Sequence, residues 1–221
     1  MSSKSYWEQA AQERLQFHQA FLKVRIEYLP YRLAKYNLSA KVWIEGDRFA
    51  ATLRSAGATV GILLYESGEL TLLDLKEKTK TIISTRDHMK QSVGIDLEPK
   101  NFFDLLKGKV IEPGESWTKT KKKTKTIILS NDQKEKAFIS TTDHWLEKLR
   151  ICQKDQCHQI EYGPKAFHVQ SQSYPQWIAF SHAKDRLRMV FLGVDFDAKD
   201  LTQNIDWAKS QVDSIPFSDE R

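Results

Sequence analysis

The sequence lacks the motifs that identify most enzymes. It has no Gly-x-Ser-x-Gly elbow, no glycine-rich phosphate loop and no His-Glu-x-x-His motif, and only 9 of its 221 residues are glycine. Its carboxylates are spread singly. Asp143 and the adjacent His144 would point apart on a strand, and no nucleophile can be assigned to them. We therefore expect a protein that is not an enzyme and that has no catalytic residues and no cofactor.

Long apolar runs are also missing. No segment approaches the ~18 to 20 consecutive apolar residues that a membrane-spanning helix needs. The first residues contain no apolar core of a signal peptide. Residues 1–5 instead look like the small polar tether that follows the lipidated cysteine of a bacterial lipoprotein, with Met1 in the place of that cysteine. We expect such an anchored protein or, if no signal peptide precedes the chain, a cytoplasmic one.

Cysteine is scarce, with two residues in the chain. Cys152 and Cys157 flank a short polar turn between two strand-like segments. Residues paired across a hairpin have Cα separations of roughly 4.5 to 5.5 Å, which is within disulfide range. A disulfide would indicate an oxidising compartment. Two free thiols, or a metal site completed by His158 and a distant His144, remain as alternatives, although the second ligand pair of a zinc site is missing.

What the chain does have is apolar and basic residues. Hydrophobic residues make up 40% and aromatic residues 11%, which is enough for a sizeable core in one domain. The net charge of +5 favours anionic partners. A lysine run whose size equals this surplus indicates either a solvated edge strand or a nucleic-acid patch: Lys119, Lys121, Lys122, Lys123 and Lys125.

The hydrophobic periodicity changes along the chain. Residues 5–29 have apolar residues three and four apart and predict an amphipathic helix that Pro30 ends. From Leu38 apolar residues alternate, with a turn at Gly46, which predicts a hairpin followed by a meander. The strands are expected at 38–45, 48–54, 59–65, 70–75, 80–83, 126–130, 136–140, 146–152, 157–162, 166–171, 176–181 and 186–192.

Two short helices interrupt these strands. The first spans about 85–93, and the second starts near Pro99 and closes at Gly108. The bulky apolar face of the second helix must cover something apolar, and an ordinary core filled by the protein's own side chains would satisfy it. Residues 195–221 form a C-terminal extension with a short helix near Trp207.

The order of these elements resembles a known family. The closest stretch is 47–108, DRFAATLRSAGATVGILLYESGELTLLDLKEKTKTIISTRDHMKQSVGIDLEPKNFFDLLKG, with a weaker match over Glu161-Tyr162-Gly163, 174–178 and 186–192. Both are similar to the LolA/LolB lipoprotein-carrier superfamily, and to LolB-like outer-membrane lipoproteins within it. The resemblance covers most of the chain through degenerate, hydrophobic motifs.

The resemblance implies a fold and a role. The fold would be mainly β (α+β), a curved antiparallel half-open β-barrel over 38–192 with lid helices at about 85–108, in a single domain spanning 1–221. Its concave face would bind lipid or lipoprotein acyl chains without catalysis. The candidate lining residues are Val42, Ile44, Phe49, Leu53, Val60, Ile62, Leu70, Leu72, Phe102, Leu106, Ile178, Phe180, Leu187 and Met189.

The same resemblance implies partners and a location. The protein would sit on the periplasmic face of the outer membrane through a lipid anchor and receive cargo from a LolA-like carrier. The exposed loop Ser55-Ala56-Gly57 departs from the family, which has a leucine at the position of Ala56. Alanine buries far less area in a bilayer, so binding is expected but membrane insertion is not assumed. The alternatives are an interaction module with a self-filled core and a nucleic-acid binder that uses the lysine run.

Overall fold

The computed structural model describes residues 2–29, 36–93, 95–112, 116–153, 156–182 and 185–216. Its helices are α1 (Ser3–Gln12), α2 (Arg86–Val93), α3 (Pro99–Leu106) and α4 (Leu201–Ser214). Its strands are β1 (Gln19–Leu29), β2 (Tyr36–Glu45), β3 (Arg48–Ser55), β4 (Ala58–Glu66), β5 (Glu69–Asp74), β6 (Thr79–Ile83), β7 (Lys119–Lys122), β8 (Thr126–Ser130), β9 (Lys136–Ser140), β10 (Leu146–Gln153), β11 (Gln156–Tyr162), β12 (Lys165–Val169), β13 (Gln172–Pro175), β14 (Trp177–His182) and β15 (Asp185–Asp195).

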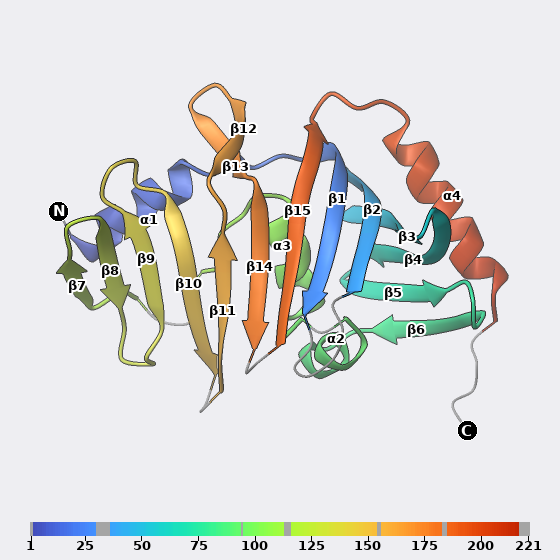
Figure 1. Cartoon of the computed structure of the whole chain (residues 1–221), viewed down its shortest axis with the longest axis horizontal. Helices are drawn as coiled ribbons and strands as arrows, with labels where there is room; N and C mark the ends of the chain where they lie inside the picture. Colours follow the sequence, from blue (N-terminus) through green and yellow to red (C-terminus); the bar gives the residue numbers. More distant parts are fainter. Residues whose placement is uncertain are drawn as a thin grey trace.

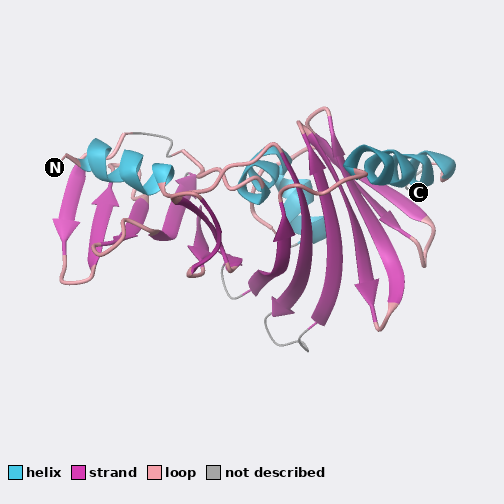
Figure 2. Cartoon of the chain, turned by 90° about the horizontal axis from the view of Figure 1, so that it is seen from above, coloured by secondary structure: helices cyan, strands magenta, loops and turns pink. Residues whose placement is uncertain are grey.

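Thirteen of these strands form one antiparallel sheet in the order β6-β5-β4-β3-β2-β1-β15-β14-β11-β10-β9-β8-β7, and β12 and β13 form a separate hairpin (Figure 1). The sheet is curved and open, because β6 and β7 are edges that do not pair with each other (Figure 2). The expected fold class, a mainly β half-open barrel with helices over its concave face, is confirmed. No helix in the described part of the chain is long and apolar enough to cross a membrane.

The helices cover different faces of the sheet. α1 lies along the β7–β10 half and α3 inside the curve of the other half, whereas α4 lies at the opposite end from α1 (Figure 2). The main core joins α1 and α3 to the concave face. A second, smaller core joins Ile205, Ala208 and Val212 of α4 to Ile62 and Leu64 on the outer face. We call the face under α4 the outer face of the sheet.

The helix expected over residues 5–29 is wrong. α1 ends at Gln12, and Gln19–Leu29 form β1 in the middle of the sheet, paired with β2 and β15. Leu22 and Val24 are buried while Lys23 between them and Arg25 after them are exposed, which is the period of two expected of a strand. Residues 3–5, which were expected to belong to a tether, form the first turn of α1. Ser2 caps this helix by accepting a hydrogen bond from the Ser5 amide at 3.2 Å.

The lysine run contains an edge strand. β7 pairs with β8 alone, and its residues are all exposed. This confirms the edge-strand interpretation for Lys119, Lys121 and Lys122, whose charges discourage other strands from adding to the sheet. The strand expected at 166–171 is β12, which already ends at Val169, and β13 after it was not expected. The helix expected near Trp207 extends over the whole of α4.

A buried arginine fixes α1 to the sheet. The Arg14 guanidinium lies between the rings of Trp145 and Tyr162, 3.9 and 3.8 Å from their centroids, and donates a hydrogen bond to the Leu146 carbonyl at 2.8 Å. Burial lowers the pKa of Arg14 to about 10. Stacking between two aromatic faces stabilises this cation where water cannot reach it.

Two tyrosines near this arginine differ in their hydrogen bonds. The Tyr174 hydroxyl donates to the Leu106 carbonyl at 3.0 Å, whereas the buried Tyr162 hydroxyl has no partner among the described residues. We expect Tyr174→Phe to lower the free energy of unfolding by about 1 kcal/mol and Tyr162→Phe to leave it unchanged or raise it. Urea unfolding at neutral pH measures both, and a larger loss for Tyr162→Phe would contradict this assignment.

The same two variants test a pH dependence. Burial raises the pKa of Tyr162 to about 12, and that of Tyr174 also rises. Between the ordinary tyrosine value near 10 and the folded value, the folded state holds a proton that the unfolded state has released. The stability from each hydroxyl is therefore complete below about pH 10 and is lost as pH rises toward 12. Tyr162→Phe should make this fall shallower.

Candidate lipid-binding cavity

An apolar cavity of about 400 Å³ lies between the concave face of the sheet and the lid formed by α2 and α3. Its size is within the range of roughly 300 to 1,000 Å³ typical of small-molecule sites. Gln91, Ser92 and Tyr36 are exposed and so mark its mouth. The lining residues are Ile26, Tyr28, Tyr36, Leu38, Leu53, Leu63, Leu72, Lys90, Gln91, Ser92, Val93, Ile95, Phe102, Leu187 and Met189.

Strand register builds the floor of the cavity. Ile26 on β1 is opposite Leu38 on β2 and Met189 on β15. Two residues further along β1, Tyr28 is opposite Tyr36 and Leu187 in the same two strands. Because residues opposite each other in an antiparallel sheet share a face, these six side chains form two adjacent apolar rows.

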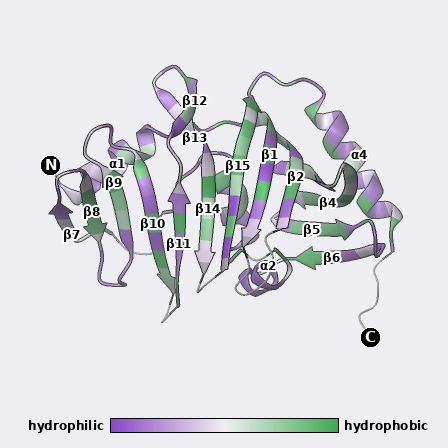
Figure 3. Cartoon of the chain, viewed as in Figure 1, coloured by the Kyte–Doolittle hydropathy of each residue, from purple (hydrophilic) through white to green (hydrophobic). Residues whose placement is uncertain are grey.

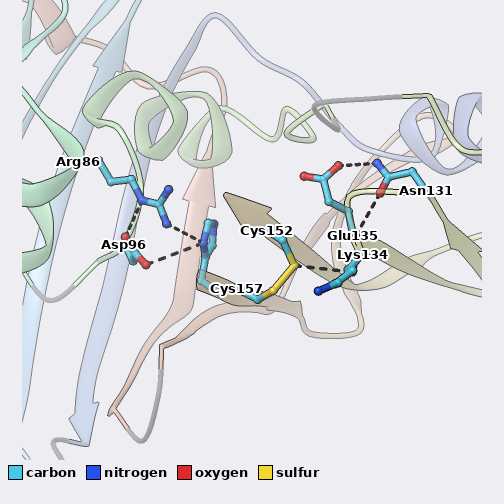
Figure 4. The surroundings of a disulfide bond; sticks show 8 residues. Arg86, Asp96, Asn131, Lys134, Glu135, Cys152 and Cys157 are labelled. Carbon is cyan, nitrogen blue, oxygen red and sulfur yellow. Dashed lines mark hydrogen bonds and ion pairs between the residues drawn. A yellow bond between two sulfur atoms is a disulfide. The ribbon is translucent and has the colours of Figure 1, made fainter. Parts of the chain in front are cut away.

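A buried charged cluster attaches the lid to the sheet. Arg86 at the start of α2 donates a hydrogen bond to Asp96, between the two lid helices, at 2.6 Å (Figure 4). Its guanidinium also lies 3.3 Å from Nδ1 of His158 on β11, which is 3.9 Å from the Asp96 carboxylate. Arg86 therefore ties both ends of the α2 segment to β11. The cluster borders a smaller cavity of about 210 Å³ that is lined largely by polar and charged residues and is unsuited to an acyl chain.

The disulfide prediction is confirmed. Cys152 and Cys157 are directly opposite across the β10–β11 hairpin and are bonded, with Cα atoms 4.1 Å apart (Figure 4). The alternatives of two free thiols or a cysteine-based metal site are therefore wrong. The bond fixes the end of the strand pair from which His158 reaches the lid.

The structure separates the expected lining residues into three groups. Five of them line the cavity: Leu53, Leu72, Phe102, Leu187 and Met189. Seven are buried in the main core without lining it: Val42, Ile44, Phe49, Leu70, Leu106, Ile178 and Phe180. The remaining two are on β4, where Ile62 packs under α4 on the outer face and the half-buried Val60 lies at the bulge that interrupts the pairing of β3 with β4. They do not line the cavity.

Several lining residues were not expected from the sequence. Ile26 and Tyr28 belong to the segment interpreted as a helix, and their alternation with Arg25 and Glu27 was the available signal. Val93 is four residues after the buried Met89 on α2, which was the available signal, whereas Ile95 follows the helix and its spacing gives none.

The expected exposed loop is a tight turn between β3 and β4. Ala56 and Gly57 are exposed and have φ angles of 47° and 85°, and Ser55 ends β3. Both central residues are left-handed, as in the two-residue turns that suit hairpins. The small Ala56 side chain is therefore presented to solvent at the tip of the hairpin.

Several solved structures have a fold similar to that of this chain. No protein-family model matches the sequence, and no curated protein matches it. A LolA superfamily protein from Nitrosomonas europaea matches with a TM-score of 0.63 and 10% identity, covering 90% of this chain and 94% of that one. A domain from Vibrio parahaemolyticus described as an outer membrane lipoprotein-sorting protein matches with a TM-score of 0.64 and 8% identity, covering 91% and 96%.

A third structure, a DUF1329 family protein from Desulfovibrio piger, has a TM-score of 0.63 and 9% identity, and covers 89% of this chain and 93% of that one. At such low identity the shared feature is the arrangement of the sheet and its helices. The chain therefore shares its fold with these three proteins.

Proposed function

We propose that this protein binds a lipid, or the acyl chains of a lipoprotein, in the cavity beneath α2 and α3. The observation that carries the proposal is an apolar cavity of about 400 Å³ on the concave face, closed on one side by a lid. Each buried methylene contributes about 0.8 kcal/mol, so several methylenes supply useful affinity without specific polar contacts. Lys90 lines the cavity beside the exposed Gln91 and Ser92, where it can meet an anionic head group.

The cellular setting is part of the proposal. A disulfide is typical of compartments outside the cytosol, and one of the fold neighbours is described as a lipoprotein-sorting domain. We place the protein in the bacterial envelope, as a LolB-like receptor that is anchored to the outer membrane and receives cargo from a LolA-like carrier. Because Ala56 offers little apolar area, the proposal covers binding and not insertion of cargo into a bilayer.

Filling the cavity should abolish binding. Leu53→Trp adds volume to the cavity wall, and we expect at least a tenfold weaker affinity for a fluorescent fatty acid. Leu192→Trp makes the same change on β15, where the side chain is 59% exposed, and should bind as the unchanged protein does. Titration of the fluorescence measures both variants.

Native mass spectrometry gives an independent result. The purified protein should carry lipid adducts that Leu53→Trp loses. An unchanged protein without adducts and without saturable fatty-acid binding would overturn the proposal, and would favour an interaction module whose core is filled by its own side chains.

A further inference from the structure

The outer face of the central strands carries a concentration of positive charge. The register places eight cations and two carboxylates, Glu27 and Glu161, in four neighbouring cross-strand rows from β10 to β3. We call the eight cations the basic outer face: Lys23, Arg25, Lys41, Arg54, Lys148, Arg150, Arg186 and Arg188. Together with the two carboxylates they carry a net charge of +6, against +5 for the whole chain, so the charges of the remaining residues almost cancel.

The two carboxylates are shared. Glu161 pairs with Arg186 at 2.8 Å and with Lys148 at 3.0 Å. Glu27 lies 3.1 Å from Arg25 and 3.9 Å from Arg188. Each carboxylate thus faces two cations, so these four cations and two carboxylates together retain a net +2.

On β1, β2 and β3, fewer carboxylates offset the positive charges of the basic outer face. Within the described residues, Lys23, Lys41 and Arg54 have no ion pair with a carboxylate, and all three are exposed. Lys23 is directly opposite Lys41 across β1 and β2. Like charges in this position destabilise a sheet, so folding alone does not explain the pair. Asp200 borders the same groove as Lys41 and Arg54, and including it still leaves a net +5.

Apolar and aromatic side chains accompany these charges. Leu192 is 59% exposed next to Lys23, and Trp207 of α4 is 45% exposed at the groove that contains Lys41. The Trp177 ring lies under the Arg188 guanidinium at 4.6 Å. Hydrophilic and hydrophobic segments alternate along β1, β10 and β15 in Figure 3. Basic residues with exposed tryptophan and leucine are typical of surfaces that bind a bilayer interface.

We propose that the basic outer face binds the surface of a membrane that contains anionic phospholipid. Charge complementarity selects an anionic partner, and the disulfide is typical of compartments in which lipid surfaces, and not nucleic acids, are the large anionic partners. The cavity opens on the opposite face of the sheet, so this contact leaves the cavity free. The proposal does not depend on what the cavity binds.

Vesicle sedimentation tests the proposal. The protein should bind phosphatidylcholine vesicles that contain phosphatidylglycerol, in a salt-dependent manner, and not vesicles of phosphatidylcholine alone. The triple variant Lys23→Glu, Lys41→Glu, Arg54→Glu should bind about 100-fold more weakly, since each basic residue near an anionic surface contributes about 1 kcal/mol. The matched control Lys119→Glu, Lys121→Glu, Lys122→Glu changes the net charge equally on β7 and should bind within about threefold of the unchanged protein.

A stability measurement separates loss of binding from loss of folding. Lys23→Glu alone replaces a like pair with an opposite pair beside Lys41, so its Tm should not fall while its binding weakens about fivefold. Equal losses in the triple variant and its β7 control would overturn the proposal, as would equal binding to neutral vesicles. Tighter binding to duplex DNA than to vesicles through the same residues would assign the surface to nucleic acid instead.

Discussion

Gly108→Ala is expected to lower the free energy of unfolding by about 4 kcal/mol. Gly108 follows α3 with a φ of +82°, and a Cβ at this position would lie 1.9 Å from the Leu15 carbonyl oxygen. The left-handed conformation costs an alanine about 1 to 2 kcal/mol, and overpacking against backbone that cannot move away costs typically 1 to 3 kcal/mol more. Urea unfolding followed by tryptophan fluorescence measures the change.

Gly68→Ala is the matched control. Gly68 has a φ of +90° at the β4–β5 turn, and nothing lies within 4 Å of an added Cβ. Gly68→Ala should therefore lower the free energy of unfolding by about 1 kcal/mol, from backbone strain alone. The difference between the two variants measures how tightly the segment after α1 packs on the end of α3, where the Phe17 amide also donates to the Lys107 carbonyl. Equal losses would show that this contact is loose.

The alternation of apolar and polar residues predicted the β2–β3 hairpin well. The hairpin of β2 and β3 turns at Gly46, which has a φ of +61°, and Ala40, Val42 and Ile44 all face the core as expected. These strands have one apolar and one polar face, so the period of two determines which side is buried. The two lid helices were also predicted, and for α3 the signals are Pro99 at its first position and Gly108 directly after its C-cap residue Lys107.

β1 could not be recognised in the same way. Its charged residues Lys23, Arg25 and Glu27 are common in helices, and apolar residues three and four apart continue from α1 into the strand. The position of β1 between β2 and β15 in the sheet decides the conformation. Pairing with the end of the chain is a tertiary effect that a local window does not contain.

The cavity could be predicted only in part. On β4 both faces are apolar, with Ile62, Leu63 and Leu64 all buried, so alternation does not say which of them faces the lid. On β5, Leu70 and Leu72 share the concave face, but Leu70 is fully buried and Leu72 lines the cavity. On β5 the pattern assigns a face to each residue, but the depth at which the lid helices sit determines which residues remain uncovered.

Substitutions of Arg14 should also lower stability strongly, and the conservative change to lysine should lower it more than a change to methionine. We expect Arg14→Lys to lower the free energy of unfolding by about 4 kcal/mol. A lysine loses the stacking between Trp145 and Tyr162, worth about 2 kcal/mol when desolvated, and the aligned hydrogen bond to the Leu146 carbonyl. It also buries a more strongly hydrated charge in the same site.

Arg14→Met should cost less, about 2 kcal/mol. Methionine fills much of the space between the two rings and brings no charge into a site that has no carboxylate paired with Arg14 among the described residues. The Lys variant should regain stability as pH rises, because burial lowers the pKa of its ammonium and the folded state then holds fewer protons than the unfolded state. Urea unfolding of both variants at neutral and alkaline pH distinguishes these effects. If Arg14→Lys were the more stable at neutral pH, the planar stacking would not be what makes this buried cation tolerable.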